Sequence, residues 1–267
     1  MQAIRSKNRI FIHGAAATPI VLIKELAKKG IEDKLNDIKL YHIHTHGFLP
    51  VGAEYDGIFS DFSLFMGKNV RKAVNAGKAD FIPVFLSQIP KLFTDNVIDL
   101  DAALIQVSPP DKHGFCSLGT SVDCTRAAIK NAKIIIAQIN SFMPRTHGDG
   151  QVHVSHIDFA VEHNEKLFGW DDEPVEPNEI QKKIGERVAD LIENDSAIQL
   201  GIGAIPNAVC ASLANHKNLG IHSEMFMDGV VDWVYNGVVN ISGNNVQNVK
   251  PIFSFAVGKK NLYRFLD

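Results

Sequence analysis

The chain has 267 residues, 45% of them hydrophobic, and a formal net charge of −3, which suits one large or two modest α/β units. Its 27 basic and 30 acidic residues are interspersed, a pattern that argues against nucleic-acid binding. No apolar run reaches the roughly 18 residues of a membrane span and no signal-like segment opens the chain, so we expect an intracellular protein, cytoplasmic, or mitochondrial if the source is eukaryotic.

The chain opens with a predicted strand at residues 9–13 (RIFIH), which runs into the small-residue loop GAAATP. A helix is predicted to follow as far as Lys29, with Thr18 as its N-cap and Pro19 in its first turn. The loop is a tight turn or, on weaker grounds, part of a phosphate-binding site.

Three alternating histidines stand in the segment IKLYHIHTHG at residues 38–47. On a strand, His42, His44 and His46 would lie on one face, as metal-binding histidines do in some hydrolases. The later His and Asp ligands of such an enzyme are not evident in the sequence. We therefore expect no metal site, and we expect these histidines to border a cleft or a subunit surface.

Predicted helices and strands then alternate as in an open α/β sheet. In order, the patterns predict a helix within residues 62–74, a strand at 80–84, a helix at 87–93, a strand at 102–107, a helix at 124–131 and a strand at 133–139. A long loop rich in Pro and Gly, residues 108–123, follows one strand end, where such sheets place their ligands. We predict an α/β fold with two domains of open, mostly parallel sheets.

The three cysteines, Cys116, Cys124 and Cys210, have no CxxC spacing and make an odd number. This pattern argues against a disulfide framework and against a cysteine zinc site. We expect them to be small core residues.

An acidic segment with two prolines, residues 168–178, indicates a domain boundary. We predict an N-terminal domain at residues 1–170, a linker at 171–178 and a second domain at 179–267. A helix with Asn178 as its N-cap opens the second domain. Its apolar stripe is formed by Ile180, Ile184, Val188, Leu191 and Ile192.

The most informative stretch is residues 199–229, QLGIGAIPNAVCASLANHKNLGIHSEMFMDG. Its pattern predicts a strand end, a glycine turn at 201–206 and a helix at 207–214. The backbone N–H groups of such a turn, with the helix dipole behind them, favour an anion or a developing oxyanion. A second strand, at 219–222, is expected to end near Glu224, which is either a solvated surface residue or a catalytic carboxylate.

Several long phrases resemble one enzyme family. QLGIGAIPNAV, LGIHSEMFMDGVVDWVYNG, SPPDKHGFCSLGTSVD and AQINSFMPRTHGDGQVHVSHIDFAVEH are similar to the family I coenzyme A transferases of the 4-hydroxybutyrate, butyrate/acetate and acetyl-CoA hydrolase/transferase branch. The resemblance extends across essentially the whole chain. Family members usually continue well beyond the last residue of this sequence, so we expect the second domain to be incomplete at its C-terminus.

The resemblance implies that Glu224 is the nucleophile and that two glycine-containing segments bind coenzyme A. The implied coenzyme A contacts are Gln199, Leu200, Gly201, Ile202, Gly203, Ala204, Gly258 and Lys259. From the residues alone, Gly258 and Lys259 fit a solvated turn equally well.

Arg145, His147 and Asp149 form a charged group in the loop at residues 140–150. They either present charge to a carboxylate or to coenzyme A, or stabilise their own loop through an Arg–Asp salt bridge. The sequence leaves both readings open.

The resemblance also implies a reaction. Coenzyme A would pass between a short-chain acyl-CoA and a free carboxylate, of the acetate, butyrate or 4-hydroxybutyrate type, by ping-pong chemistry through a glutamyl-CoA thioester. The implied substrates are an acyl-CoA and a small carboxylate, with no permanently bound cofactor, and the implied assembly is a homodimer or higher homo-oligomer. Two alternatives stay open: an acetyl-CoA hydrolase with the same nucleophile, and a catalytically inactive truncated form.

Overall fold

The computed structural model describes residues 1–172, 176–201, 203–239 and 250–267. The chain divides into two compact units, the first formed by residues 1–168 with 266–267 and the second by residues 169–265. The predicted linker at 171–178 begins close to this division, and its residues 173–175 lie outside the described part. None of the helices in the described ranges is long and apolar enough to span a membrane.

The first unit is built on a seven-stranded sheet in which every neighbouring pair is parallel. Its strands are β1 (Arg9–Ile12), β2 (Ile38–His42), β3 (Phe59–Ser63), β4 (Asp80–Phe81), β5 (Ala102–Val107), β7 (Ile134–Ile139) and β9 (Phe159–Glu162). The order β4-β3-β2-β1-β5-β7-β9 reverses direction between β1 and β5. In open α/β sheets, ligands bind at the carboxyl ends of the strands flanking such a reversal.

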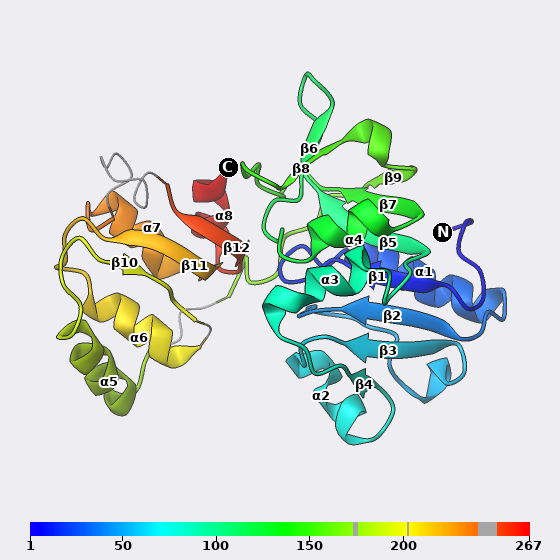
Figure 1. Cartoon of the computed structure of the whole chain (residues 1–267), viewed down its shortest axis with the longest axis horizontal. Coiled ribbons are helices and arrows are strands. Elements are labelled where there is room, and N and C mark those ends of the chain that lie inside the picture. Colours follow the sequence, from blue (N-terminus) through cyan, green and yellow to red (C-terminus); the bar gives the residue numbers. More distant parts are fainter. Residues whose placement is uncertain (173–175, 202, 240–249) are drawn as a thin grey trace. The chain divides into compact units, whose positions relative to one another are not determined.

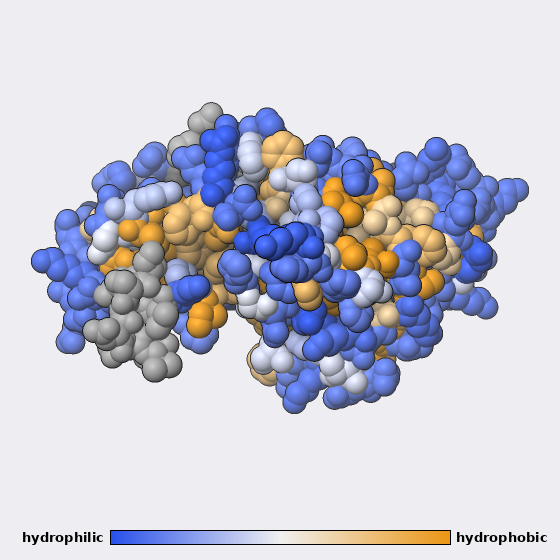
Figure 2. Space-filling model, turned by 90° about the horizontal axis from the view of Figure 1, so that it is seen from above, coloured by the Kyte–Doolittle hydropathy of each residue, from blue (hydrophilic) through white to orange (hydrophobic). Residues whose placement is uncertain are grey.

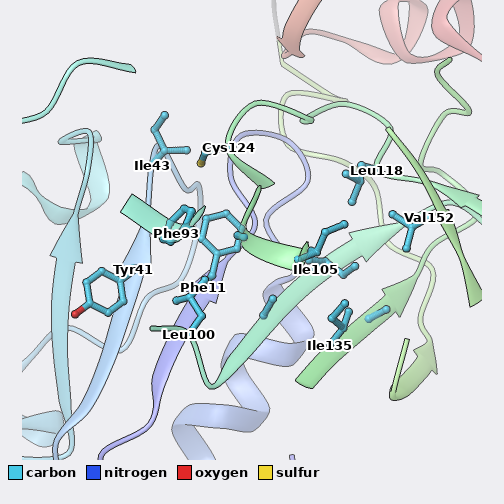
Figure 3. Close-up of a cluster of buried hydrophobic side chains, with 14 of the residues drawn as sticks. Phe11, Tyr41, Ile43, Phe93, Leu100, Ile105, Leu118, Cys124, Ile135 and Val152 are labelled. Atoms are coloured by element: carbon cyan, nitrogen blue, oxygen red, sulfur yellow. The ribbon is translucent and has the colours of Figure 1, made fainter. Parts of the chain in front are cut away.

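Helices cover both faces of this sheet (Figure 1). They are α1 (Ile20–Glu32), α2 (Lys68–Asn75), α3 (Ile89–Thr94) and α4 (Thr125–Asn131), with 3₁₀ turns at Ala53–Tyr55, Leu86–Gln88 and Val154–His156. Because side chains alternate along a strand, Ile10 packs with α1 on one face and Phe11 packs with α3 and α4 on the other. Figure 3 shows the second of these cores, in which the rings of Phe11 and Phe93 meet edge to face, 5.6 Å apart.

The second unit holds a smaller parallel sheet with the order β10-β11-β12. Its elements are α5 (Glu179–Ala189), β10 (Ala197–Ile198), α6 (Ala204–Ser212), β11 (Gly220–Phe226), α7 (Asp228–Tyr235), β12 (Ile252–Ala256) and α8 (Lys260–Leu266). The predicted start of α5 is confirmed: Asn178 accepts from the amide of Gln181, whose side chain accepts from the amide of Asn178. Two parallel sheets with alternating helices confirm the predicted fold class.

Several sequence predictions about local structure were wrong or incomplete. Four strands were not predicted, namely β3, β9 and the antiparallel pair β6 (Phe115–Ser117) and β8 (Gln151–His153). Thr18 does not cap α1: the N-cap is Pro19, and the Thr18 hydroxyl donates to the carbonyl of Ala15 (2.8 Å) and accepts from the amide of His46 (3.1 Å).

The three histidines do not share one strand face, because β2 ends at His42. His42 is buried, and its Nε2 lies 2.9 Å from a carboxylate oxygen of the equally buried Asp61. His44 is only partly buried, and desolvation lowers its pKa, whereas His46 stacks on Phe168 with ring centroids 3.7 Å apart. The expectation that all three border a cleft or surface is therefore wrong for His42.

Candidate active site

A single hydroxyl joins the end of β10 to the middle of β11. The Ser223 Oγ accepts from the amide of Leu200 (3.0 Å) and donates to the carbonyl of Leu200 (2.9 Å), and both residues are buried. These bonds continue the parallel pairing of Ile198 with Ile221. The start of the glycine turn is thereby fixed against the strand that carries Glu224.

Glu224 lies within β11, because this strand runs on to Phe226. The prediction that it follows a strand ending at residue 222 is wrong; pairing with β12 keeps the backbone extended through Met225 and Phe226. Continuing the β10–β11 register through the Leu200–Ser223 contact places Gly201 beside Glu224. The Glu224 side chain is half-buried.

The glycine turn leads directly into helix α6. Gly203 is the N-cap residue, with φ 127° and ψ −176°, a backbone conformation that only glycine adopts readily. No side chain caps the helix, no acidic residue lies in its first turn, and Ala204 is exposed. Because the first amides of a helix have no partner within it, this turn can bind an anion at the positive end of the helix dipole.

The predicted coenzyme A contacts in this turn differ in exposure. Gln199, Gly201, Gly203 and Ala204 are exposed, and Leu200 is buried. Ile202 lies outside the described residues.

Gly258 and Lys259 follow β12, the strand that pairs with β11. Their backbone amides already have partners: Gly258 donates to the Tyr263 hydroxyl (3.3 Å), and Lys259 donates to both carboxylate oxygens of Asp228 (3.0 and 3.2 Å). Counted along the extended strand β12, they lie roughly 13 Å beyond the position that is opposite Glu224 in β11. In this conformation the Lys259 ammonium group, not the two amides, is available to a phosphate.

A cavity of about 550 Å³ lies in the second unit, between the end of β11 and helices α6 and α7. Of the described residues, Met225 lines it and Glu224 does not, as expected where neighbouring side chains of a strand point to opposite faces. Burial raises the pKa of Asp228, which lines this cavity, and the Lys259 amide and ammonium group partly offset that effect. Burial also raises the pKa of Cys210 to about 12.

Residues 1–169 match the family described as the acetyl-CoA hydrolase/transferase N-terminal domain. The chain belongs to the acetyl-CoA hydrolase/transferase family. It is 48% identical over 265 residues to a succinyl-CoA:acetate/propanoyl-CoA:succinate CoA transferase of Fasciola hepatica, covering 99% of this chain and 55% of that protein. It is 41% identical over 269 residues to a 4-hydroxybutyrate coenzyme A transferase of Clostridium kluyveri, covering 99% of this chain and 61% of that protein.

Among solved structures, RipA from Yersinia pestis aligns over 99% of this chain and 64% of its own, with a TM-score of 0.89 and 28% identity. The chain thus spans between half and two thirds of the length of these relatives. The family predicted from the sequence is confirmed.

In this member of the acetyl-CoA hydrolase/transferase family, Arg145 stabilises loops of the first unit. Its Nη2 donates to the carbonyls of Pro109 (2.7 Å) and Phe115 (3.0 Å). Its ion pair, at 3.8 Å, is with Asp111 and not with Asp149. The loop-stabilising reading is therefore correct for Arg145, with a different carboxylate as partner.

The expectation of a cleft is confirmed for His46, which lines a pocket of about 190 Å³ in the first unit. It lies at the carboxyl ends of β1 and β5, where the strand order reverses, and its polar lining includes Thr18, His46, Gln106 and Glu165. Under it, the Gln106 amide oxygen accepts from the side-chain amide of Asn140 (2.6 Å). The sequence signals that were passed over are Gln106 within the apolar strand β5 and Asn140 directly after the apolar strand β7.

Proposed function

We propose that the protein transfers coenzyme A between a short-chain acyl-CoA and a small carboxylate, with Glu224 as the nucleophile. The observation that carries the proposal is the pair of hydrogen bonds between Ser223 and Leu200, which fixes the start of an uncapped glycine turn beside Glu224. One relative is named for succinyl, acetate and propanoyl groups and another for 4-hydroxybutyrate. These names support short-chain acids as the substrate class.

The proposed chemistry has two covalent intermediates. A Glu224 carboxylate oxygen attacks the acyl-CoA carbonyl carbon, the carbon–sulfur bond breaks, and CoA thiolate leaves an acyl-glutamyl anhydride. The thiolate then attacks the Glu224 carbonyl carbon, which releases the first acid as its carboxylate and leaves a glutamyl-CoA thioester. An acceptor carboxylate reverses both steps and regenerates Glu224.

Each step develops negative charge on a carbonyl oxygen. The first-turn amides of α6, at Ala204 and Ile205, are the proposed donors, since no side chain caps them. Loss of one such donor typically costs about 3 kcal/mol of transition-state stabilisation. Contacts to the remote part of coenzyme A would hold the thioester against Glu224. The proposed contacts are Gln199, Leu200, Gly201, Ile202, Gly203, Ala204, Gly258 and Lys259.

The reaction exchanges one thioester and one carboxylate for another such pair, so the proposal requires no ATP. Coenzyme A enters as a substrate and not as a permanently bound cofactor. The homo-oligomer and the cytoplasmic or mitochondrial location stay predictions from the sequence.

A hydrolase is the second candidate, because the family description joins hydrolase and transferase activities. Water that reaches either intermediate takes the place of the acceptor acid, and the same carboxylate then yields free acid and free coenzyme A. A transferase passes coenzyme A to an acceptor carboxylate, so a new acyl-CoA forms only when an acceptor acid is present. A hydrolase releases free coenzyme A without any acceptor.

The decisive experiment traps the thioester. The protein is incubated with acetyl-CoA and treated with borohydride, which reduces a glutamyl thioester to an alcohol, and the modified peptide is located by mass spectrometry. We expect reduction at Glu224, its complete loss in Glu224→Gln, and full reduction in the control Glu193→Gln, which changes an exposed carboxylate of the same unit.

Two other results are informative. Reduction only when the chain carries the additional length found in its relatives would mean that the 267 residues alone are the inactive form. Absence of reduction in both forms would contradict the transferase proposal.

A further inference from the structure

Helix α5 presents its apolar stripe to the outside of the second unit. Ile180 is 71% exposed, and Leu191, in the turn that follows the helix, is 83% exposed. Figure 2 shows that hydrophobic side chains reach the molecular surface at several places. The apolar residues of the α5 stripe differ from isolated ones in that they line one common space. This shallow, open space of about 340 Å³ is here called the α5 groove, and its lining residues all come from α5 and the turn after it: Ile180, Lys183, Ile184, Arg187, Val188 and Leu191.

The opposite face of α5 is already occupied. Gly185 and Ala189 are its buried residues, and a Cβ atom added at Gly185 would lie 2.6 Å from the carbonyl oxygen of Ala208 in α6. Because the two helices meet this closely, α5 cannot rotate to bury its stripe without losing that contact. Ile184 and Val188 in the stripe are partly buried, but Ile180 and Leu191 remain exposed among the described residues, and exposed apolar surfaces of this kind mark interaction sites.

The charges in the groove restrict what can cover it. Its two charged residues, Lys183 and Arg187, are both basic and both exposed. A second copy of α5 packed against the stripe would bring these cations near their counterparts, which is unfavourable. A helix with an apolar stripe flanked by Asp or Glu would be complementary in both respects.

The length of the relatives supplies a source for such a helix. Each of the two relatives aligns with 99% of this chain. The aligned part is only 55% of the length of one relative and 61% of the length of the other. We propose that the α5 groove is the docking surface for an acidic amphipathic helix from the part of these proteins that the chain does not match.

Thiol labelling tests this proposal, because the three native cysteines are all buried. We compare Leu191→Cys in the 267-residue chain and in a chimera in which this chain replaces the matched part of the Fasciola hepatica relative. The matched control is Glu186→Cys, an exposed position on α5 outside the groove. We expect maleimide to modify Leu191→Cys at least about tenfold more slowly in the chimera than in the chain, since a docked helix must open first, whereas Glu186→Cys keeps its rate.

The charge complementarity has its own test. Adding Lys183→Glu and Arg187→Glu to the chimera is expected to restore rapid labelling of Leu191→Cys; unchanged protection would overturn the acidic character of the partner. Equal labelling of Leu191→Cys in chain and chimera would overturn the docking surface. Protection in the chain alone that rises with protein concentration would overturn the proposed occupant in favour of a second copy.

If the chimera shows no cooperative thermal transition, the labelling experiment is made in the full-length relative. A cysteine at its position aligned with Leu191 is expected to resist labelling, and rapid labelling there would overturn the proposal.

Discussion

Ser223 connects the glycine turn of the candidate site to strand β11 of the sheet. Its hydroxyl satisfies both the buried amide and the buried carbonyl of Leu200. We expect Ser223→Ala to lower the free energy of unfolding by about 1–3 kcal/mol, because two buried backbone groups lose their partner.

Urea unfolding of this variant measures the effect. Ser254→Ala, in the neighbouring strand β12, is the control, and Ser223→Thr is expected to recover part of the loss because it keeps the hydroxyl. A Ser223→Ala variant as stable as the parent would show that Leu200 is held by other contacts.

Asp228 gives the second unit a pH-dependent stability. Burial raises its pKa in the folded chain above the ordinary value of 3.8. The stability that the protonated carboxyl contributes is therefore fully present below about pH 3.8 and is lost as the pH rises through the raised pKa. Since an amide does not ionise, we expect Asp228→Asn to raise the Tm near pH 7, with a gain that shrinks toward pH 4.

Thermal unfolding between pH 4 and pH 8 checks this expectation, with the exposed Asp190→Asn as control. A gain that does not change with pH would contradict a raised pKa of Asp228.

At the scale of elements, the close contact between α5 and α6 requires a residue without a side chain at Gly185. Substituting alanine for glycine within a helix normally stabilises it by about 1 kcal/mol. At Gly185 the new methyl group would meet the backbone of Ala208, which cannot move aside as a flexible side chain would. We expect Gly185→Ala to lower the free energy of unfolding by about 1–2 kcal/mol, because the overlap outweighs the gain in helix propensity.

Chemical denaturation of Gly185→Ala and of Glu186→Ala, an exposed neighbour on the same helix, separates these effects. Increased stability of Gly185→Ala would mean that the two helices can move apart at little cost.

Elements with a local signal could be predicted from the sequence. The apolar run AALIQV became β5 with the predicted bounds, and Asn178 with Gln181 formed the cap that starts α5. Strand β3 was missed because its sequence, FSDFS, alternates buried and partly exposed residues and includes a buried aspartate. That aspartate is stable in the core only because His42, from another strand, lies beside it.

The candidate site was predictable in part for the same reason. The glycine turn and Glu224 stand out in the sequence, but their proximity depends on the register of β10 against β11, which is fixed by the hydroxyl of Ser223, 23 residues along the chain from Leu200. For Gly258 and Lys259 the sequence left a phosphate contact and a solvated turn equally open, and their amides donate to Tyr263 and Asp228. The Lys259–Asp228 and Leu200–Ser223 contacts join residues 31 and 23 positions apart, and contacts of this kind leave no periodic signal in the sequence.

At the scale of the whole molecule, the first unit holds two complete hydrophobic cores, one on each face of its sheet. We therefore expect residues 1–168 to fold without the rest of the chain. Near-ultraviolet circular dichroism and a cooperative thermal transition would show this. In the same piece, Phe93→Ala is expected to lower stability by about 3–5 kcal/mol, because its ring is fully buried. A piece that unfolds without a cooperative transition would contradict the division into units.

The burial of all three cysteines has a consequence for a protein that handles coenzyme A. Disulfide exchange requires an accessible thiolate, and burial keeps Cys116, Cys124 and Cys210 protonated by raising each pKa. If CoA thiolate is released in every catalytic cycle, as proposed, the folded chain offers it no sulfur with which to form a mixed disulfide. The protein can then work in the presence of oxidised coenzyme A without being inactivated through its own thiols.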